Sequence, residues 1–206
     1  MVEASVTSIS DLSESDLALD VLTRVRWFAV YTKSRHEKVL RDELLKKHVE
    51  TFLPVRNVER HWSDRTKIME EPLFQSYLFV KIPWSERWKV LNTVGAVSLI
   101  GMSHGKPVEV PQKEIETLQQ FVSQEIRIDP FPYLKTGERV YVRSGPFKGA
   151  EGFIVHKNQR CRLVVSLDLL MQSVSVEIDS ACVEKMTVEK FKSEKVKRFE
   201  IRYGEN

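Results

Sequence analysis

The side chains from which catalytic and metal sites are usually built are scattered in this chain. Its five histidines fall on different predicted elements without the spacing of metal ligands; they are His36, His48, His61, His104 and His156. Glu70 and Glu71 lie beside a strand break with no second acidic cluster nearby that could share a metal. The sequence patterns of serine hydrolases, zinc proteases, thiol oxidoreductases and phosphate-binding loops are missing. We therefore expect a binding protein that is not an enzyme and holds no metal or cofactor.

The composition is that of an ordinary globular protein. The 206 residues suffice for one domain of average size or two small ones. No apolar run reaches the roughly 18 residues that span a bilayer. Several acidic residues lie within positions 1–25, whereas a signal peptide would begin with basic residues. Cys161 and Cys182 are too few for a disulfide framework. We expect a cytoplasmic monomer without a membrane partner.

The net charge of +3 is unevenly distributed. Residues 1–25 carry one basic and five acidic side chains, whereas residues 26–122 carry 16 basic and 12 acidic ones. A positive surplus in the middle of the chain is compatible with nucleic-acid binding, although scattered Lys and Arg are more often a solvated surface. Charge alone leaves both interpretations open.

The region from Arg26 to Val122 reads as one α+β domain. The apolar run WFAVYT predicts a central strand, and Ser34 with Glu37 forms the S-x-x-E pattern of a helix capping box. A hairpin is expected between Glu59 and Lys67, and Pro111 opens a helix with an apolar stripe. Strands interleaved with helices on one sheet are typical of this class.

The C-terminal region reads as a small barrel. The stretch RSGPFKGAEGFIV places Gly145, Gly149 and Gly152 between two strand-like runs, which indicates a tight turn and a bend in a sheet. Residues 137–186 hold about five short strands, as in a small closed barrel. In residues 123–136 the apolar residues lack the regular spacing of a helix or strand, and the segment contains Pro130 and Pro132, so we expect a linker there. The chain would thus have an acidic extension (1–25), the two domains, the linker and a basic tail (187–206).

The order of these segments resembles the NusG family of transcription elongation factors. The matching blocks are WFAVYTKSRHEK, FLPV, EPLFQSYLFV and VGAVSLIG, then GERVYVRSGPFKGAEGFIV and SVSVEID after the linker. The resemblance implies an NGN domain, an α/β sandwich with an antiparallel sheet and flanking helices, over residues 26–122. It also implies a five-stranded, SH3-like KOW β-barrel over residues 137–186.

The same resemblance implies two binding sites in the NGN domain. An apolar patch would dock on the clamp helices of the large catalytic subunit of RNA polymerase; the matching positions are Tyr31, Phe74, Tyr77, Phe79 and Ile115. Aromatic anchors of this kind carry most of the energy of a protein interface. Basic residues beside it would contact the phosphates of the non-template strand or the upstream DNA; they are Lys33, Arg35, Lys38 and Arg41.

The KOW domain would recruit further partners. The KOW motif corresponds here to the segment that contains Gly145, Phe147, Gly149 and Gly152. Partners would bind at a separate loop, where the general factor has a Phe-Gly-Arg stretch. In this chain that loop contains Leu169, Leu170, Met171 and Gln172. A small-subunit ribosomal protein fits this role, whereas the missing Arg puts Rho binding in doubt. The glycines also interrupt any helix, which favours a stable barrel over a helical hairpin.

Three functions follow from this reading. The first is an antitermination factor of the specialised RfaH or UpxY kind, favoured because Gln75 and Ser76 stand where the general factor reads Pro-Gly. The second is a general NusG factor that couples transcription to Rho or the ribosome. The third is a KOW-containing RNA-binding protein of the ribosomal type, which leaves the first domain unexplained.

Overall fold

Two compact units make up the part of the chain that the structure describes. The structure is a computed structural model, and it describes residues 22–62, 65–103, 106–124, 126–134, 137–157 and 160–186, with backbone alone at 102–103, 106–107, 157 and 160. The first unit comprises the described residues of Met1–Leu53 and Phe74–Gln112, and the second those of Pro54–Leu73 and Lys113–Asn206. Most of the expected acidic extension and the whole basic tail lie outside the described residues.

A four-stranded antiparallel sheet forms the centre of the first unit. Its strands are β1 (Val25–Thr32), β2 (Glu50–Phe52), β5 (Tyr77–Pro83) and β6 (Ala96–Leu99), in the spatial order β2-β5-β1-β6. The central strand β1 carries four consecutive buried residues from Trp27 to Val30, so both of its faces are covered. The prediction that WFAVYT forms a central strand is confirmed.

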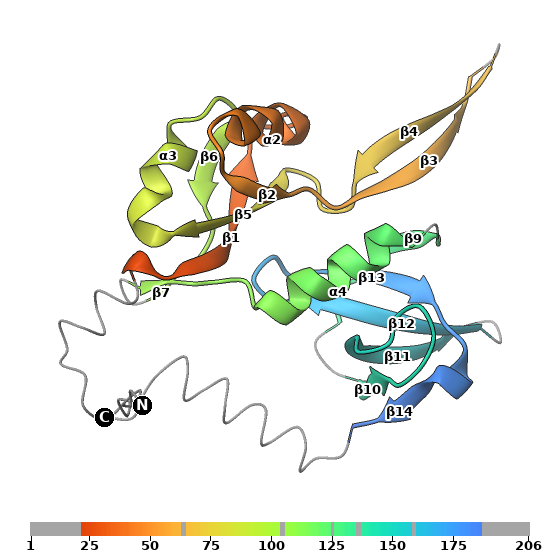
Figure 1. Cartoon of the computed structure of the whole chain (residues 1–206). Helices are drawn as coiled ribbons and strands as arrows, with labels where there is room; N and C mark the ends of the chain where they lie inside the picture. Colours follow the sequence, from red (N-terminus) through yellow and green to blue (C-terminus); the bar gives the residue numbers. More distant parts are fainter. Residues whose placement is uncertain are drawn as a thin grey trace, which may run out of the picture. The chain divides into compact units, whose positions relative to one another are not determined.

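Helices α2 (Glu37–Lys46) and α3 (Arg87–Leu91) lie beside this sheet, as Figure 1 shows. Leu40 and Leu44 of α2 are fully buried, which explains the apolar spacing of this segment. The remaining elements of the unit are the 3₁₀ turn η2 (Trp84–Glu86) and the short strands β7 (Met102–Ser103) and β8 (Lys106–Pro107). No helix in the described part of the chain is both long and apolar enough to cross a membrane.

The expected capping box at the start of α2 is wrong. The residue before the helix is His36, and no side chain caps the helix. Glu37 is buried and binds the backbone of a distant turn, described below, so its carboxylate does not reach back to the preceding residues. A tertiary contact has replaced the local one that the S-x-x-E pattern predicted.

A six-stranded antiparallel sheet dominates the second unit. Its strands are β9 (Ile128–Phe131), β10 (Glu138–Val142), β11 (Glu151–Lys157), β12 (Arg160–Leu167), β13 (Gln172–Glu177) and β14 (Val183–Lys185), in the order β14-β10-β11-β12-β13-β9. The 3₁₀ turn η3 (Ser180–Cys182) precedes β14. The five strands expected in residues 137–186 are all present, and β14 and β9 end the hydrogen-bonded order.

The sixth strand, β9, lies within residues 123–136, where the sequence predicted no regular element. It pairs with β13 through residues 128–131, and Pro130 lies opposite Val174. Proline has no N–H to donate, so strands that contain it occur at sheet edges, which is where β9 lies. Part of the expected linker is therefore an edge strand of the C-terminal sheet.

The glycine-rich turn between β10 and β11 has the backbone that its sequence predicted. Gly145 and Gly149 have φ angles of +84° and +94°, a region that side chains rarely adopt. A Cβ atom at Gly152 would lie 2.5 Å from the carbonyl oxygen of Val164 on the neighbouring strand. Close backbone approach therefore requires glycine at this position.

The second unit also contains a long hairpin and a helix. Strands β3 (Val55–His61) and β4 (Thr66–Pro72) form the hairpin predicted around residues 59–67, visible in Figure 1 as a two-stranded ribbon. Helix α4 (Gln112–Ser123) belongs to this unit from Lys113 onward. Its apolar stripe is buried as predicted, at Ile115, Leu118 and Phe121.

Helix α4 packs on the turn between β10 and β11. The rings of Phe121 and Phe147 meet edge to face with centroids 4.9 Å apart. Beside them the side-chain amide of Gln120 donates a hydrogen bond to the carbonyl oxygen of Lys148 at 3.0 Å. The helix is thus joined to the C-terminal sheet by an apolar and a polar contact.

Candidate functional site

Five aromatic rings gather on one face of the four-stranded sheet. We call this the aromatic face; it consists of Tyr31, Phe52, Phe74, Tyr77 and Phe79. Tyr31 lies opposite Tyr77 in the pairing of β1 and β5, and Phe52 lies opposite Phe79 in that of β2 and β5. Since alternate residues of a strand point to the same side, Tyr77 and Phe79 share this face.

The rings contact one another in pairs. The centroids of Tyr31 and Tyr77 are 5.6 Å apart, and those of Phe52 and Phe79 are 6.2 Å apart in a stacked arrangement. Phe74 meets Phe79 edge to face with centroids 6.1 Å apart. These separations are typical of aromatic pairs that gain energy beyond the area they bury.

Solvent reaches three rings of the aromatic face, Tyr31, Tyr77 and Phe52, but not the other two. The side chain of Tyr31 is 40% exposed and Tyr77 is half-buried, whereas Phe74 and Phe79 are buried at 1% and 0%. Ile115, the fifth expected polymerase contact, is also buried and belongs to the second unit. Of the five expected residues, the structure therefore brings four together and exposes two, Tyr31 and Tyr77.

A clamped turn places Phe74 on this face. The backbone N–H of Tyr77 donates to the carbonyl oxygen of Phe74 at 3.3 Å, which closes a turn through Gln75 and Ser76. Strict alternation would put Phe74 out of phase with Tyr77 and Phe79. The turn changes the register, as the sequence required if all these rings were to share one face.

Ser76 is the strained residue of this turn. Its φ of +63° lies in the left-handed region, which costs a residue other than glycine about 1–2 kcal/mol. Its N–H donates to the Glu37 carboxylate (Oε1) at 2.7 Å, and its carbonyl oxygen accepts from the N–H of Thr32 at 2.9 Å. Glu37 and Thr32 are both buried, so water does not compete for these hydrogen bonds.

Sequence reasoning missed two residues of the site. Phe52 lies in the quoted block that contains FLPV, but its partner Phe79 is visible only once β2 and β5 are paired. Glu37 was assigned to a helix cap, and nothing in the local sequence relates it to Ser76, which lies 39 residues further along the chain.

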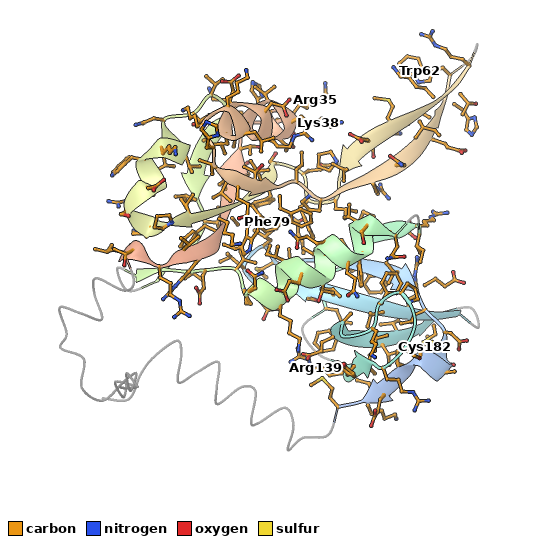
Figure 2. All side chains as sticks on the ribbon, in the orientation of Figure 1. Arg35, Lys38, Trp62, Phe79, Arg139 and Cys182 are labelled. Atoms are coloured by element: carbon orange, nitrogen blue, oxygen red, sulfur yellow. The ribbon has the colours of Figure 1, made fainter. Side chains whose placement is uncertain are left out.

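The expected phosphate-binding residues surround the start of α2. Lys33 and Arg35 are exposed in the loop between β1 and α2, and Lys38 is half-buried on the first turn of the helix. Figure 2 labels Arg35 and Lys38 at this end of α2. The guanidinium of Arg41, further along the helix, contacts the carboxylate of Asp42 at 2.8 Å, which offsets its charge.

The expected partner-binding loop of the C-terminal sheet is the turn between β12 and β13. Met171 is 68% exposed and has a φ of +51°, whereas Leu170 is buried and Leu169 is half-buried. Gln172 pairs with Leu167 as the first residue of β13. The turn is fixed from the side by Asp168, which accepts a hydrogen bond from the hydroxyl of Tyr133 at 3.0 Å.

The residues that the sequence predicted to form the KOW motif contribute to the fold. Phe147 is buried against α4, and Gly145, Gly149 and Gly152 shape the turn and the following strand. Within the described residues, no three His, Cys, Asp or Glu side chains gather as metal ligands would. What the described arrangement offers is a half-exposed aromatic edge, a group of cations and an exposed methionine, which are features of binding surfaces.

The known proteins that resemble this chain include several NusG proteins. Residues 25–119 match the family model of the transcription termination factor NusG. The transcription termination/antitermination protein NusG of Borreliella burgdorferi is 24% identical over 181 residues, which cover 78% of this chain and 98% of the relative. The corresponding protein of Neisseria meningitidis serogroup B is 26% identical over 174 residues, with the same coverage.

A structure titled "Domain interaction in Thermotoga maritima NusG" aligns with a TM-score of 0.49 and 22% identity, over 80% of this chain and 98% of that one. Over most of its length this chain is similar to NusG transcription termination/antitermination proteins, and its residues 25–119 match the NusG family model.

Proposed function

We propose that this protein is a transcription elongation and antitermination factor that binds RNA polymerase through residues 26–122 and suppresses pausing or termination. The proposal rests on the match of residues 25–119 to the NusG family model. The observation that carries it is the Tyr31–Tyr77 pair, which solvent reaches on the same face of the sheet as the buried rings of Phe74 and Phe79. The bound surface would be the clamp helices of the large catalytic subunit.

Tyr31 and Tyr77 are suited to anchor such a contact. Each ring already has an aromatic neighbour that fixes it, so little side-chain entropy is lost on binding. Phe74 and Phe79 contact each other on the same face of the sheet and are buried. We assign the direct contact to the tyrosines and a positioning role to the phenylalanines.

The test is binding of purified RNA polymerase to the full chain and to the double variant Tyr31→Ala plus Tyr77→Ala. Truncating an interface anchor costs on the order of 2–4 kcal/mol, so the double variant should recover little polymerase. Trp88→Ala is the matched control because Trp88 is exposed in the same unit but lies outside the aromatic face. Equal recovery with the double variant would refute the proposed contact.

A nucleic-acid contact would accompany the docking. Lys33, Arg35 and Lys38 form the group we assign to the non-template strand or upstream DNA, with Arg41 contributing less because of Asp42. Phosphate contacts of this kind position a protein without reading sequence and weaken as salt rises. A terminator readthrough assay with Lys33→Gln plus Arg35→Gln should show reduced antitermination.

The C-terminal sheet would recruit a second partner. Exposed Met171 on the turn between β12 and β13, with Leu169 beside it, offers an adaptable apolar contact. We assign it to a small-subunit ribosomal protein, as in the general NusG factor. Rho is a doubtful partner because no Arg stands at positions 169–172 to make a charge-assisted bond.

A general NusG factor is the second candidate. Readthrough measured with and without Rho separates the two, since an antitermination factor raises readthrough whereas a Rho-coupled factor lowers it when Rho is added. In either case we expect the protein in the cytoplasm, associated with the nucleoid through the polymerase.

A further inference from the structure

The β3–β4 hairpin separates its charges by face. Residues paired across antiparallel strands share a face, so the pairs Arg56–Glu71 and Arg60–Lys67 lie on one side of the ribbon. Trp62 continues that side, since its N–H donates to the carbonyl oxygen of Arg65 at 2.8 Å and extends the same pairing. We call this side the basic face; its polar and aromatic members are Arg56, Arg60, Trp62, Arg65, Lys67 and Glu71.

The separation is hidden in the sequence because the hairpin is neutral overall. Residues 54–73 contain four Lys or Arg and four Asp or Glu residues. By the register, all four cations lie on the basic face with the single carboxylate Glu71, whereas Glu59 and Glu70 lie on the opposite face. The fourth acid, Asp64, lies outside the described residues. One face of the described ribbon is therefore strongly positive and the other negative.

The ion pairs leave positive charge on this face. Glu71 is shared between Arg60 at 2.5 Å and Arg56 at 3.7 Å, and Arg56 also lies 3.9 Å from the carboxylate of Asp129. Lys67 lies directly opposite Arg60, and like charges in that position destabilise a sheet. A bound anion would remove this cost.

Trp62 adds a second kind of binding group. Its side chain is 62% exposed, and Figure 2 shows it at the far end of the ribbon. Alternation puts it on the same face as Arg60, about 7 Å along the strand. A large ring held in water beside cations is poorly explained by stability, because the hairpin gains little from it.

We propose that the basic face binds an unpaired nucleic-acid strand, with Trp62 stacking on a base and Arg60 and Lys67 contacting the neighbouring phosphates. Stacking on an aromatic ring needs the face of an unpaired base, and flanking cations suit the backbone on either side of it. An acidic peptide would match the charge but would leave the exposed ring without a specific role. This site is separate in sequence and in element from the cations near α2.

The test measures binding of the full chain to fluorescent oligonucleotides of about 12 nucleotides, a site size typical of single-strand binding grooves. The probes are single-stranded DNA, single-stranded RNA of the same sequence, and the DNA duplex. The single strands should bind more tightly than the duplex, and the stronger of the two identifies the natural strand. Polymerase is absent, so the result does not depend on the proposed docking function.

The variants isolate the hairpin from other cations. Trp62→Ala should weaken single-strand binding by about 5- to 150-fold, the range for loss of one stacked base, and Trp62→Phe should restore most of it. Lys67→Gln should weaken binding and lower the salt dependence by about 0.7 logarithmic units per decade. Ile68→Ala is the matched control, since Ile68 is 63% exposed on the opposite face. Tyr31→Ala plus Tyr77→Ala should bind like the wild type.

Three outcomes would overturn the proposal. They are no binding of the wild type to any strand, wild-type affinity in Trp62→Ala, and equal binding of duplex and single strand. A poly-glutamate peptide that binds the wild type but not Trp62→Ala, while nucleic acid binds both equally, would instead assign the face to an acidic protein partner.

Discussion

The carboxylate of Glu37 accepts a hydrogen bond from the backbone N–H of Ser76 at 2.7 Å, although 39 residues separate the two. This bond ties the first turn of α2 to the turn that leads into β5. Because Tyr77 follows Ser76 directly, the position of the exposed tyrosine edge depends on a buried acid that does not itself belong to the edge.

Replacing Glu37 should destabilise the protein. Glu37→Ala leaves a buried N–H without an acceptor, which costs about 1–3 kcal/mol, whereas Glu37→Gln keeps an acceptor oxygen and should lose less. Urea unfolding measures both, and Asp42→Ala on the exposed side of the same helix is the control. Equal midpoints for Glu37→Ala and the wild type would show that the bond contributes nothing.

Replacing Ser76 by glycine should have the opposite effect. Glycine removes the left-handed strain at φ +63°, and after its larger loss of chain entropy about 0.5–1 kcal/mol of stabilisation remains. Ser98→Gly in β6 is a suitable comparison, since an extended strand position should lose stability instead. Thermal unfolding should show a higher melting temperature for Ser76→Gly and a lower one for Ser98→Gly than for the wild type. A lower melting temperature for Ser76→Gly would contradict the strain argument.

Removing the glycine at the β11–β12 contact should be severe. Gly152→Ala would place a Cβ 2.5 Å from the carbonyl oxygen of Val164, and a forced overlap of this kind typically costs about 1–3 kcal/mol. Gly149→Ala meets no atom within 4 Å, so only its positive φ opposes the change. Denaturant unfolding should therefore give Gly152→Ala a lower free energy of unfolding than Gly149→Ala. The reverse order would contradict the close approach of the Gly152 backbone to the carbonyl oxygen of Val164.

The C-terminal sheet should lose stability in acid through Asp129. Burial alone raises the pKa of Asp129, but hydrogen bonds from Arg127 and Arg162 outweigh it and hold the pKa below its ordinary value. The stabilisation is therefore present above the unfolded pKa of about 3.9 and disappears as the pH falls through the lower folded pKa.

Asp129→Asn tests this sign. The variant should be less stable than the wild type at neutral pH, and the difference should shrink when both proteins are measured at about pH 3 or below. Denaturant unfolding at a series of pH values gives the comparison. A difference that stays constant across the series would show that the Asp129 charge is not involved.

The sequence predicted the elements whose signals are local. The apolar run at β1, the hairpin strands β3 and β4 and the stripe of α4 each depend on neighbours within a few residues, and each is confirmed. The capping box failed because Glu37 finds a stronger partner far away in sequence. β9 was missed because its proline, Pro130, disfavours a strand in general, and only the position of β9 at the edge of the sheet makes that proline acceptable.

The candidate site was predictable in composition but not in exposure. The aromatic residues of β1 and β5 were identified as a group, and the pairing of Tyr31 with Tyr77 brings them together. Which rings are covered depends on packing between strands that are distant in sequence, so the burial of Phe74 and Phe79 could not be deduced. The basic face of the hairpin was also invisible, because the sequence of that segment is neutral and the register alone separates its charges.

The contact between Phe121 and Phe147 restricts how the protein can be divided for experiments. A fragment that begins at residue 137 would leave Phe147 bare and would also strip β9 from β13, so that an unpaired strand edge could recruit a second copy. Recombinant versions of the C-terminal half should therefore start upstream of α4, and aggregation of shorter ones would reflect the cut rather than the native molecule.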